Sequence, residues 1–244
     1  MVLMRLAMLA RRRMAANRLR VPFARSASFA MPASIWLGSR EVPLRLPPEG
    51  GVRTAFVELL LDDCYRLRRL KHERIEHVID IGANVGLFGI AARAAFPTAT
   101  IHAYEPNPAL EHNLLHQARG ARFDVFLEAV GREAGRVRLD VNEAESVHTS
   151  SHLDPAGTIP QVALRTAIER IGGSVDLLKM DCEGAEWEML EDLESWSAAR
   201  FVTMEYHLRP GLDHESICGA LGRCGFHIVD QRRIDSYGLV LARR

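Results

Sequence analysis

Short apolar runs rich in β-forming residues alternate with helical stretches along most of this chain, and this alternation limits the fold more than any other feature. Five runs predicted to be internal strands cover residues 77–81, 100–105, 123–128, 175–181 and 201–206. The predicted helices cover residues 86–96, 108–119, 166–171, 184–193 and 214–224, and two closing strands cover residues 226–230 and 237–242. Strands joined through helices pair in parallel and are covered on both faces. The pattern therefore predicts an α/β fold with one mainly parallel sheet.

An acidic residue stands at the end of each of the five internal strands: Asp80, Glu105, Glu128, Asp181 and Glu205. Open parallel sheets bind their ligands outside the carboxyl ends of the strands. One acid at such a position is unremarkable, but five along the same edge are difficult to explain by solubility alone. The sequence therefore predicts a binding site at that edge.

The loop after the first of these strands, DIGANVG from Asp80 to Gly86, gives the strongest local signal. Its glycines, Gly82 and Gly86, allow close approach of the backbone to a ligand, and the following helix offers free N–H groups. A dinucleotide site needs G-x-G-x-x-G, and here Asn84 stands in place of the middle glycine. Asn84 and the acid disfavour a diphosphate and favour a ligand with a cationic amino-acid portion, such as S-adenosylmethionine. A tight turn without a ligand is the alternative.

Two further strand ends fit the remainder of that cofactor. Glu105 lies 19 residues after Gly86, where its carboxylate would accept hydrogen bonds from both ribose hydroxyls. Dinucleotide enzymes also place an acid there, so Glu105 alone does not separate the two cofactors. Glu128, followed by Ala129, is expected to bind the adenine amino group. Either carboxylate could instead be an ordinary structural residue.

Three motifs occur in a specific order: DIGANVG from Asp80, YEPNP from Tyr104 and KMDCEGAE from Lys179. In this combination the chain resembles the FkbM family of S-adenosylmethionine-dependent methyltransferases, over about residues 54–242. The sequence Glu205-Tyr206-His207 matches the family's acid near the fifth strand. One departure is at residues 162–166, where the family often carries an acid after a Thr-Leu pair and this chain reads VALRT.

The resemblance implies a fold, a reaction and a set of cofactor residues. The fold is the α/β class I methyltransferase fold, a Rossmann-like doubly wound sheet of seven strands, mostly parallel with the last strand antiparallel. The reaction is typically O-methylation of a hydroxyl on a sugar or small natural product, so the expected partner is a small hydroxylated acceptor. The expected cofactor residues are Asp80, Gly82, Asn84, Gly86, Glu105, Asn107, Glu128 and Ala129.

Methyl transfer to a hydroxyl needs a base close to the methyl group, at the carboxyl edge of the sheet. The candidate catalytic residues there are Asp181, Glu183, Glu205 and His207. Asp181 and Glu183 could instead favour a helix start through the helix dipole, and His207 could be part of the hydrogen-bonded architecture. Together the four could also bind a hard divalent cation, but a metal is not the favoured interpretation.

Two positions in the motif KMDCEGAE, Lys179 and Glu186, carry charges in predicted strand and helix segments. Lys179 is one of only two lysines and lies in an otherwise apolar strand, so a pair with Glu205 or Asp181 is expected. Glu186 is expected on a solvated helix face or in a buried pair with an arginine.

The net charge of zero conceals an asymmetry along the chain. Residues 1–40 hold eight arginines and no acid, whereas residues 41–244 hold 23 basic and 31 acidic groups. The excess of acidic groups in residues 41–244 argues against a nucleic-acid partner, because proteins bind nucleic acids by neutralising their phosphates. The longest uncharged run near the N-terminus, residues 26–39, is too short to span a membrane.

We predict three segments: residues 1–34, a basic arm that is mobile or targeting-like; residues 35–70, a strand pair and a helix over 54–70; and residues 71–244, the catalytic domain. The arm has the composition of a mitochondrial presequence, but a start codon placed too early would also produce it. The four cysteines show no metal-binding or scaffold spacing, which favours free thiols in the reducing cytoplasm. A mitochondrial location is the alternative.

Two other functions compete with methyl transfer. One is a non-catalytic domain that binds S-adenosylmethionine as a scaffold, and the other is a nicotinamide oxidoreductase, which Asn84 disfavours. The polar segment 142–161 is expected to be a loop, either over the substrate or on the surface.

Overall fold

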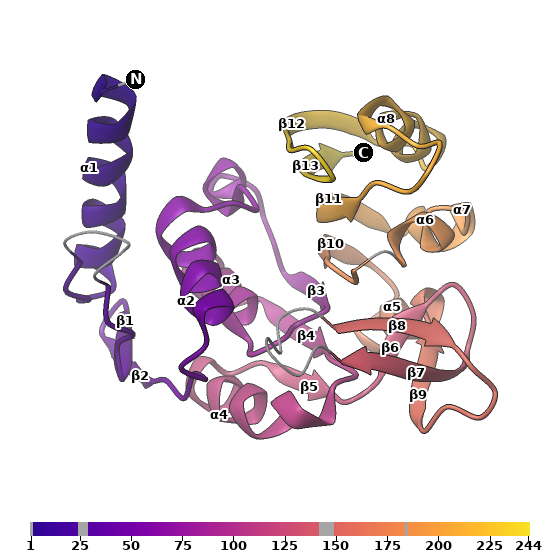
Figure 1. The fold of residues 1–244 in the computed structure, drawn as a ribbon, viewed down its shortest axis with the longest axis horizontal. Helices are drawn as coiled ribbons and strands as arrows, with labels where there is room; N and C mark the ends of the chain where they lie inside the picture. Colours follow the sequence, from indigo (N-terminus) through magenta and orange to yellow (C-terminus); the bar gives the residue numbers. More distant parts are fainter. Residues whose placement is uncertain (1, 24–28, 142–148, 184) are drawn as a thin grey trace.

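The structure is a computed structural model that describes residues 2–23, 29–141, 149–183 and 185–244. Its main sheet has seven strands in the order β12-β13-β11-β10-β3-β4-β5 (Figure 1). All neighbouring pairs from β5 to β11 are parallel, and β13 is antiparallel to both β11 and β12. The strands are β3 (His77–Ile81), β4 (Thr100–Tyr104), β5 (Asp124–Phe126), β10 (Val175–Met180), β11 (Ala199–His207), β12 (His227–Arg233) and β13 (Tyr237–Arg243). This arrangement confirms the predicted fold.

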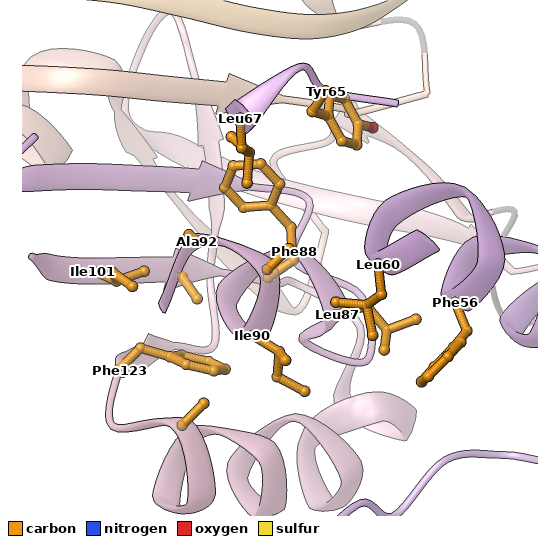
Figure 2. Close-up of a cluster of buried hydrophobic side chains, with 14 of the residues drawn as sticks. Phe56, Leu60, Tyr65, Leu67, Leu87, Phe88, Ile90, Ala92, Ile101 and Phe123 are labelled. Atoms are coloured by element: carbon orange, nitrogen blue, oxygen red, sulfur yellow. The ribbon is translucent and has the colours of Figure 1, made fainter. Parts of the chain in front are cut away.

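Helices connect the parallel strands and cover both faces of the sheet. They are α3 (Leu87–Ala95), the 3₁₀ turn η4 (Pro108–Leu110), α4 (Glu111–Ala121), α5 (Leu164–Arg170) and α8 (His214–Arg223). On one face, Leu87, Phe88 and Ile90 of α3 lie among buried side chains from the neighbouring elements (Figure 2). The ring of Phe88 meets the ring of Tyr65 edge-on, with centroids 5.5 Å apart. This packing fixes Tyr65 beside the carboxyl edge of the sheet.

The predicted helix over residues 54–70 is wrong beyond Asp62. The helix α2 (Gly50–Phe56) continues as the π-helix η2 (Val57–Asp62), and Asp63 then adopts a left-handed conformation with φ +59°. The Asp63 carboxylate accepts the N–H groups of Leu67 and Arg68, at the start of the 3₁₀ helix η3 (Leu67–Leu70). A side chain that accepts hydrogen bonds from nearby backbone N–H groups competes with the helical carbonyls for those groups, and the helix ends there.

The predicted helix over residues 184–193 is also replaced by two short helices, α6 (Glu186–Met189) and α7 (Leu193–Trp196). The Asp192 side chain accepts the Ser195 N–H and so begins α7 afresh. Residue 184 lies outside the described ranges.

The segment predicted as a loop over residues 142–161 contributes two strands to a second sheet. That sheet has the order β6-β9-β7-β8, with β6 (Ala129–Gly131), β7 (Gly135–Val141), β8 (Thr149–Leu153) and β9 (Ile159–Ala163). Residues 142–148 lie outside the described part of the chain. The loop prediction is therefore wrong for the residues in β8 and β9, because pairing with β7 and β6 decides their conformation.

The N-terminal segment consists of the helix α1 (Val2–Arg18) and a hairpin of β1 (Ser34–Leu37) and β2 (Arg40–Pro43). Figure 1 shows these elements at the end of the molecule away from β12 and β13. Two hydrogen bonds of 2.6 and 2.5 Å join the Arg12 guanidinium to the Asp62 carboxylate of η2. Ala15 and Ala16 of α1 are buried in the same contact. None of the helices in the described ranges has the length and hydropathy needed to cross a bilayer.

Candidate active site

A cavity opens to solvent at the carboxyl ends of the parallel strands. Seven of the residues predicted for the site line it: Gly82, Asn84, Glu105, Glu128, Ala129, Asp181 and Glu183. The other five lie outside its lining: Asp80, Gly86, Asn107, Glu205 and His207. The structure therefore brings most of the predicted residues together at the expected edge.

The loop after β3 packs against the end of β4 and against Asp181, which follows β10. The N–H groups of Gly82 and Ala83 donate to the carbonyl of Tyr104, each at 3.0 Å. Gly82 has φ +74°, and a Cβ atom there would lie 1.8 Å from the carbonyl oxygen of Asp181. Only glycine satisfies both conditions, because other residues rarely adopt this conformation and none has room for the Cβ atom.

Glu105 is the buried centre of the cavity, with 5% of its surface exposed. One carboxylate oxygen accepts the N–H of Asn84, and the other accepts the N–H of Asn107, each at 2.8 Å. A carboxylate can accept about four hydrogen bonds, so each oxygen retains acceptor capacity toward the cavity. Burial raises the pKa of Glu105 to about 7, although these N–H groups oppose the shift.

Asn84 and Asn107 position Glu105 by their backbone conformations. Asn84 has φ +49°, and its side-chain oxygen accepts the N–H of Val85 at 2.7 Å, a local bond that suits this conformation. Asn107 accepts the Ala109 N–H at 3.0 Å and thereby begins η4. Asn107 is therefore buried behind the cavity lining, where its backbone N–H holds the Glu105 carboxylate.

Asp80 lies under the loop, fully buried, and forms an ion pair with Lys179 at 3.0 Å. The Lys179 ammonium also donates to the carbonyls of Gly82 at 2.6 Å and Ile81 at 3.2 Å, and it lies 3.9 Å from the Asp181 carboxylate. Burial alone would lower the pKa of Lys179, but the carboxylates of Asp80 and Asp181 raise it on balance. Asp80 therefore acts on the loop through Lys179 and is not part of the cavity wall.

Glu128 forms an ion pair with Arg170 at the end of α5. The Arg170 guanidinium also lies over the ring of Phe126, 4.4 Å from its centroid. The ring of Phe126 stacks with that of Tyr104 at 4.8 Å. This arrangement fixes the Glu128 carboxylate at one end of the cavity.

A group of carboxylates surrounds His207 at the end of β11. Its Nε2 atom lies 3.5 Å from Glu183 and 3.7 Å from Glu205, and its Nδ1 atom lies 3.4 Å from the fully buried Glu186. The indole of Trp187 donates to the His207 carbonyl at 2.7 Å. The predicted solvated position of Glu186 is thus wrong, because its side chain is fully buried against His207.

These contacts decide the charge of His207. The hydrogen bond with Glu186, with the nearby carboxylates of Glu183 and Glu205, raises the pKa of His207 to about 9. Burial and the charge of Asp181 raise the pKa of Glu205 to about 8. His207 is therefore an imidazolium at neutral pH, and an imidazolium does not accept a proton.

Asp181 and Glu183 form the side of the cavity next to this group. The Tyr65 hydroxyl donates to Asp181 at 2.8 Å. Glu183 has φ +51°, an uncommon conformation for a residue other than glycine and one that is often found at functional sites. Within the described ranges, no three or more His, Cys, Asp or Glu side chains are grouped to hold a metal ion.

The model of the methyltransferase FkbM domain matches residues 80–228, more than half of the sequence and the whole of this edge. The chain belongs to the FkbM methyltransferase family. Methyltransferase sdnD of Sordaria araneosa is 28% identical, over 78% of this chain and 88% of its own. The 31-O-demethyl-FK506 methyltransferase FkbM of Streptomyces tacrolimicus is 25% identical, over 75% of this chain and 85% of its own.

The FkbM-family chain also has the class I methyltransferase fold seen in solved structures. The crystal structure of magnesium protoporphyrin IX methyltransferase (ChlM) from Synechocystis PCC 6803 with bound SAM superposes with a TM-score of 0.50. That comparison covers 79% of this chain and 81% of the other, at 14% identity.

Several side chains that shape the site of this FkbM-family protein are not among the predicted site residues. Tyr65 and Arg170 lie outside the motifs, so only the packing of the fold identifies them. Glu186 did carry a signal, because it is the last residue of the motif KMDCEGAE. Trp187 follows it directly and contacts the same histidine.

Proposed function

We propose that this protein is an S-adenosylmethionine-dependent O-methyltransferase that acts on a small hydroxylated acceptor such as a sugar or natural product. The observation that carries the proposal is the Glu105 carboxylate, which is buried, fixed by two N–H groups and still able to accept at both oxygens. Two neighbouring ribose hydroxyls would satisfy both oxygens. The name of the Streptomyces tacrolimicus relative specifies methylation at an oxygen of FK506, which supports an oxygen acceptor here.

The residues around the cavity fit the remaining parts of this cofactor. The Gly82 loop and Asp181 offer carbonyl and carboxylate oxygens, which suit the cationic amino group and the sulfonium. Glu128, Ala129 and Val130 line the far end, where the adenine would lie. S-Adenosylmethionine, when bound, supplies an electrophilic methyl group.

Glu183 is our candidate for the general base. It lines the cavity, whereas the raised pKa of His207 favours its protonated form and the Asp181 carboxylate accepts the Tyr65 hydroxyl. A base that takes the acceptor proton contributes about 10²–10⁴-fold to the rate. In this scheme the His207 imidazolium orients Glu183 and Glu205, and Glu186 holds the imidazolium in place.

The proposal is tested by calorimetry with S-adenosylhomocysteine and by incubation of the protein, a metabolite extract and trideuteromethyl-labelled cofactor. We expect saturable binding and a new extract component that carries one labelled methyl group on oxygen, identified by mass spectrometry. Glu183→Gln is the matched control, which should bind the product but transfer little label.

Two results would contradict the proposal. Binding without transfer to any acceptor in a broad panel would favour a non-catalytic scaffold. Tight binding of NADH with no binding of S-adenosylhomocysteine would favour a nicotinamide enzyme.

A further inference from the structure

A second and larger cavity, also open to solvent, lies at the opposite edge of the sheet from the candidate active site. Its walls come from α1, the turn between β1 and β2, the segment from η2 to η3, and the C-terminal half of α3. Thr98 and Ala99, which immediately precede β4, line it, whereas the active-site cavity lies beyond the other ends of the strands. We call this space the basic cavity because of its lining.

Positive charge collects around the basic cavity without matching negative charge. Five arginines line it (Arg18, Arg40, Arg68, Arg93 and Arg122), against a single acid, Asp63. Asp63 already accepts two backbone N–H groups and lies 4.0 Å from the Arg68 guanidinium. Burial lowers the pKa of Arg93, and the charges of Arg40 and Arg122 lower it further. The arginines therefore repel one another, and an anion between them would relieve that repulsion.

Arg93 makes one wall of the basic cavity rigid. Its guanidinium donates to the carbonyls of Pro97 at 2.9 Å, Ala99 at 2.7 Å, Ala121 at 2.9 Å and Arg122 at 2.5 Å. These bonds occupy four of its five N–H donors. They also hold Arg122 in a left-handed conformation with φ +59°. Arg93 thus fixes the wall while Arg122 presents its own guanidinium.

The side chains available to an anion are those of Arg18 and Arg122. Both residues are exposed, and in the described part of the chain neither has an ion pair with a carboxylate. Arg40 contributes charge nearby while donating to the Gly120 carbonyl. Guanidinium groups suit carboxylate and phosphate oxygens in particular, because their planar donors match those anions.

Most of the remaining lining is apolar, apart from the hydroxyl side chains of Ser39 and Thr98. Leu19, Trp36, Leu59, Leu60 and Ala91 contribute to it. The Arg12–Asp62 ion pair and the buried Ala15 and Ala16 hold α1 as one side of the cavity, so the apolar walls are fixed in place. A ligand that fills this space needs an apolar body as well as a charged group.

We propose that the basic cavity binds an amphipathic anion, a single carboxylate or phosphate group attached to an apolar body. The anionic group would lie between Arg18 and Arg122, and the apolar body would lie against Trp36 and the leucines. The site is separate from the active site, so the proposal does not depend on the proposed methyl transfer.

The test uses the full chain and four probes, each below its micelle concentration where it forms micelles: dodecanoate, dodecyl phosphate, dodecanol and inorganic phosphate. Binding is followed by calorimetry and by tryptophan fluorescence. We expect dodecanoate, dodecyl phosphate or both to bind, and the one that binds more tightly identifies the anionic group. Dodecanol and inorganic phosphate should each bind at least about tenfold more weakly, since each lacks one half of the ligand. The Trp36→Phe variant should lose the fluorescence change and retain the heat of binding.

Variants separate the charge contribution from general affinity for apolar tails. Arg18→Gln and Arg122→Gln should each weaken binding about tenfold, the loss expected for one charge-assisted hydrogen bond. The exposed Arg53 of α2 lies outside the lining, so Arg53→Gln is the matched control and should bind as the unmodified protein does. S-Adenosylhomocysteine should not compete with the probes.

Three outcomes would overturn the inference. The first is that neither anionic amphiphile binds. The second is that dodecanol or inorganic phosphate binds as tightly as the amphiphiles. The third is that both arginine variants bind as the Arg53→Gln control does.

Discussion

Replacing Asp80 with alanine should destabilise the protein by about 3–5 kcal/mol, because it removes one partner of a buried ion pair and leaves the Lys179 ammonium in the sheet. The side chains of Asp80 and Lys179 are 0% and 3% exposed, so water cannot take the place of the lost carboxylate. The Asp181 carboxylate, at 3.9 Å, is too far to replace a contact of 3.0 Å.

The double variant Asp80→Leu/Lys179→Met removes both charges and should be less destabilised than Asp80→Ala. Replacing a buried ion pair by apolar residues of similar size is often nearly neutral. The double variant still loses two hydrogen bonds to the carbonyls of Gly82 and Ile81, a cost of about 0.5–1.5 kcal/mol each. Because the Gly82 carbonyl then loses the Lys179 ammonium, we expect the double variant to bind S-adenosylhomocysteine weakly.

Urea unfolding followed by circular dichroism measures the stabilities, and calorimetry measures the affinities. A loss of less than about 1 kcal/mol in Asp80→Ala, well below that expected for a broken buried pair, would show that the ion pair does not stabilise the fold. Normal stability with lost affinity would instead mean that Asp80 touches the cofactor directly, as the sequence alone suggests. Normal affinity in the double variant would show that Lys179 does not position the loop.

Three further predictions concern the carboxylates of the site. Glu105→Gln should reduce the affinity for S-adenosylhomocysteine at least about tenfold. The unmodified protein should lose affinity as the pH falls through about 7, where Glu105 becomes protonated, and calorimetry at several pH values checks both. Glu186→Gln should lower the pKa of His207, which NMR titration measures directly. Because the pKa of His207 in the folded protein, about 9, lies above its usual 6.5, the stability from this site is complete below pH 6.5 and lost as the pH rises through 9. Urea unfolding of the variant should show little of that loss. Glu183→Gln should lower turnover by about 10²–10⁴-fold with product affinity within a few-fold, and equal losses of turnover and affinity would assign Glu183 to cofactor binding.

The sequence predicts the main sheet well because its strands are apolar runs separated by helices. The predicted strand over residues 77–81 coincides with β3. Prediction from the sequence fails where contacts between distant residues decide the local structure. Asp63 ends η2 through its own side-chain bonds, and β9 forms only because β6 and β7 lie beside it.

In the candidate site too, some features can be predicted from the sequence and others cannot. Acids at the strand ends gather at one edge, since that follows from a parallel sheet. The sequence does not reveal that Asp80, one residue before the end of β3, faces Lys179 under the loop. It also does not reveal that Glu186 makes His207 a cation, because that depends on the short helix α6 turning inward.

A crystal structure of the protein with S-adenosylhomocysteine tests the central claim most directly. We expect both ribose hydroxyls within hydrogen-bond distance of the two Glu105 oxygens, with the sulfur on the side of Asp181 and Glu183. A nucleoside bound elsewhere, or a Glu105 carboxylate without contact to the ribose, would contradict it.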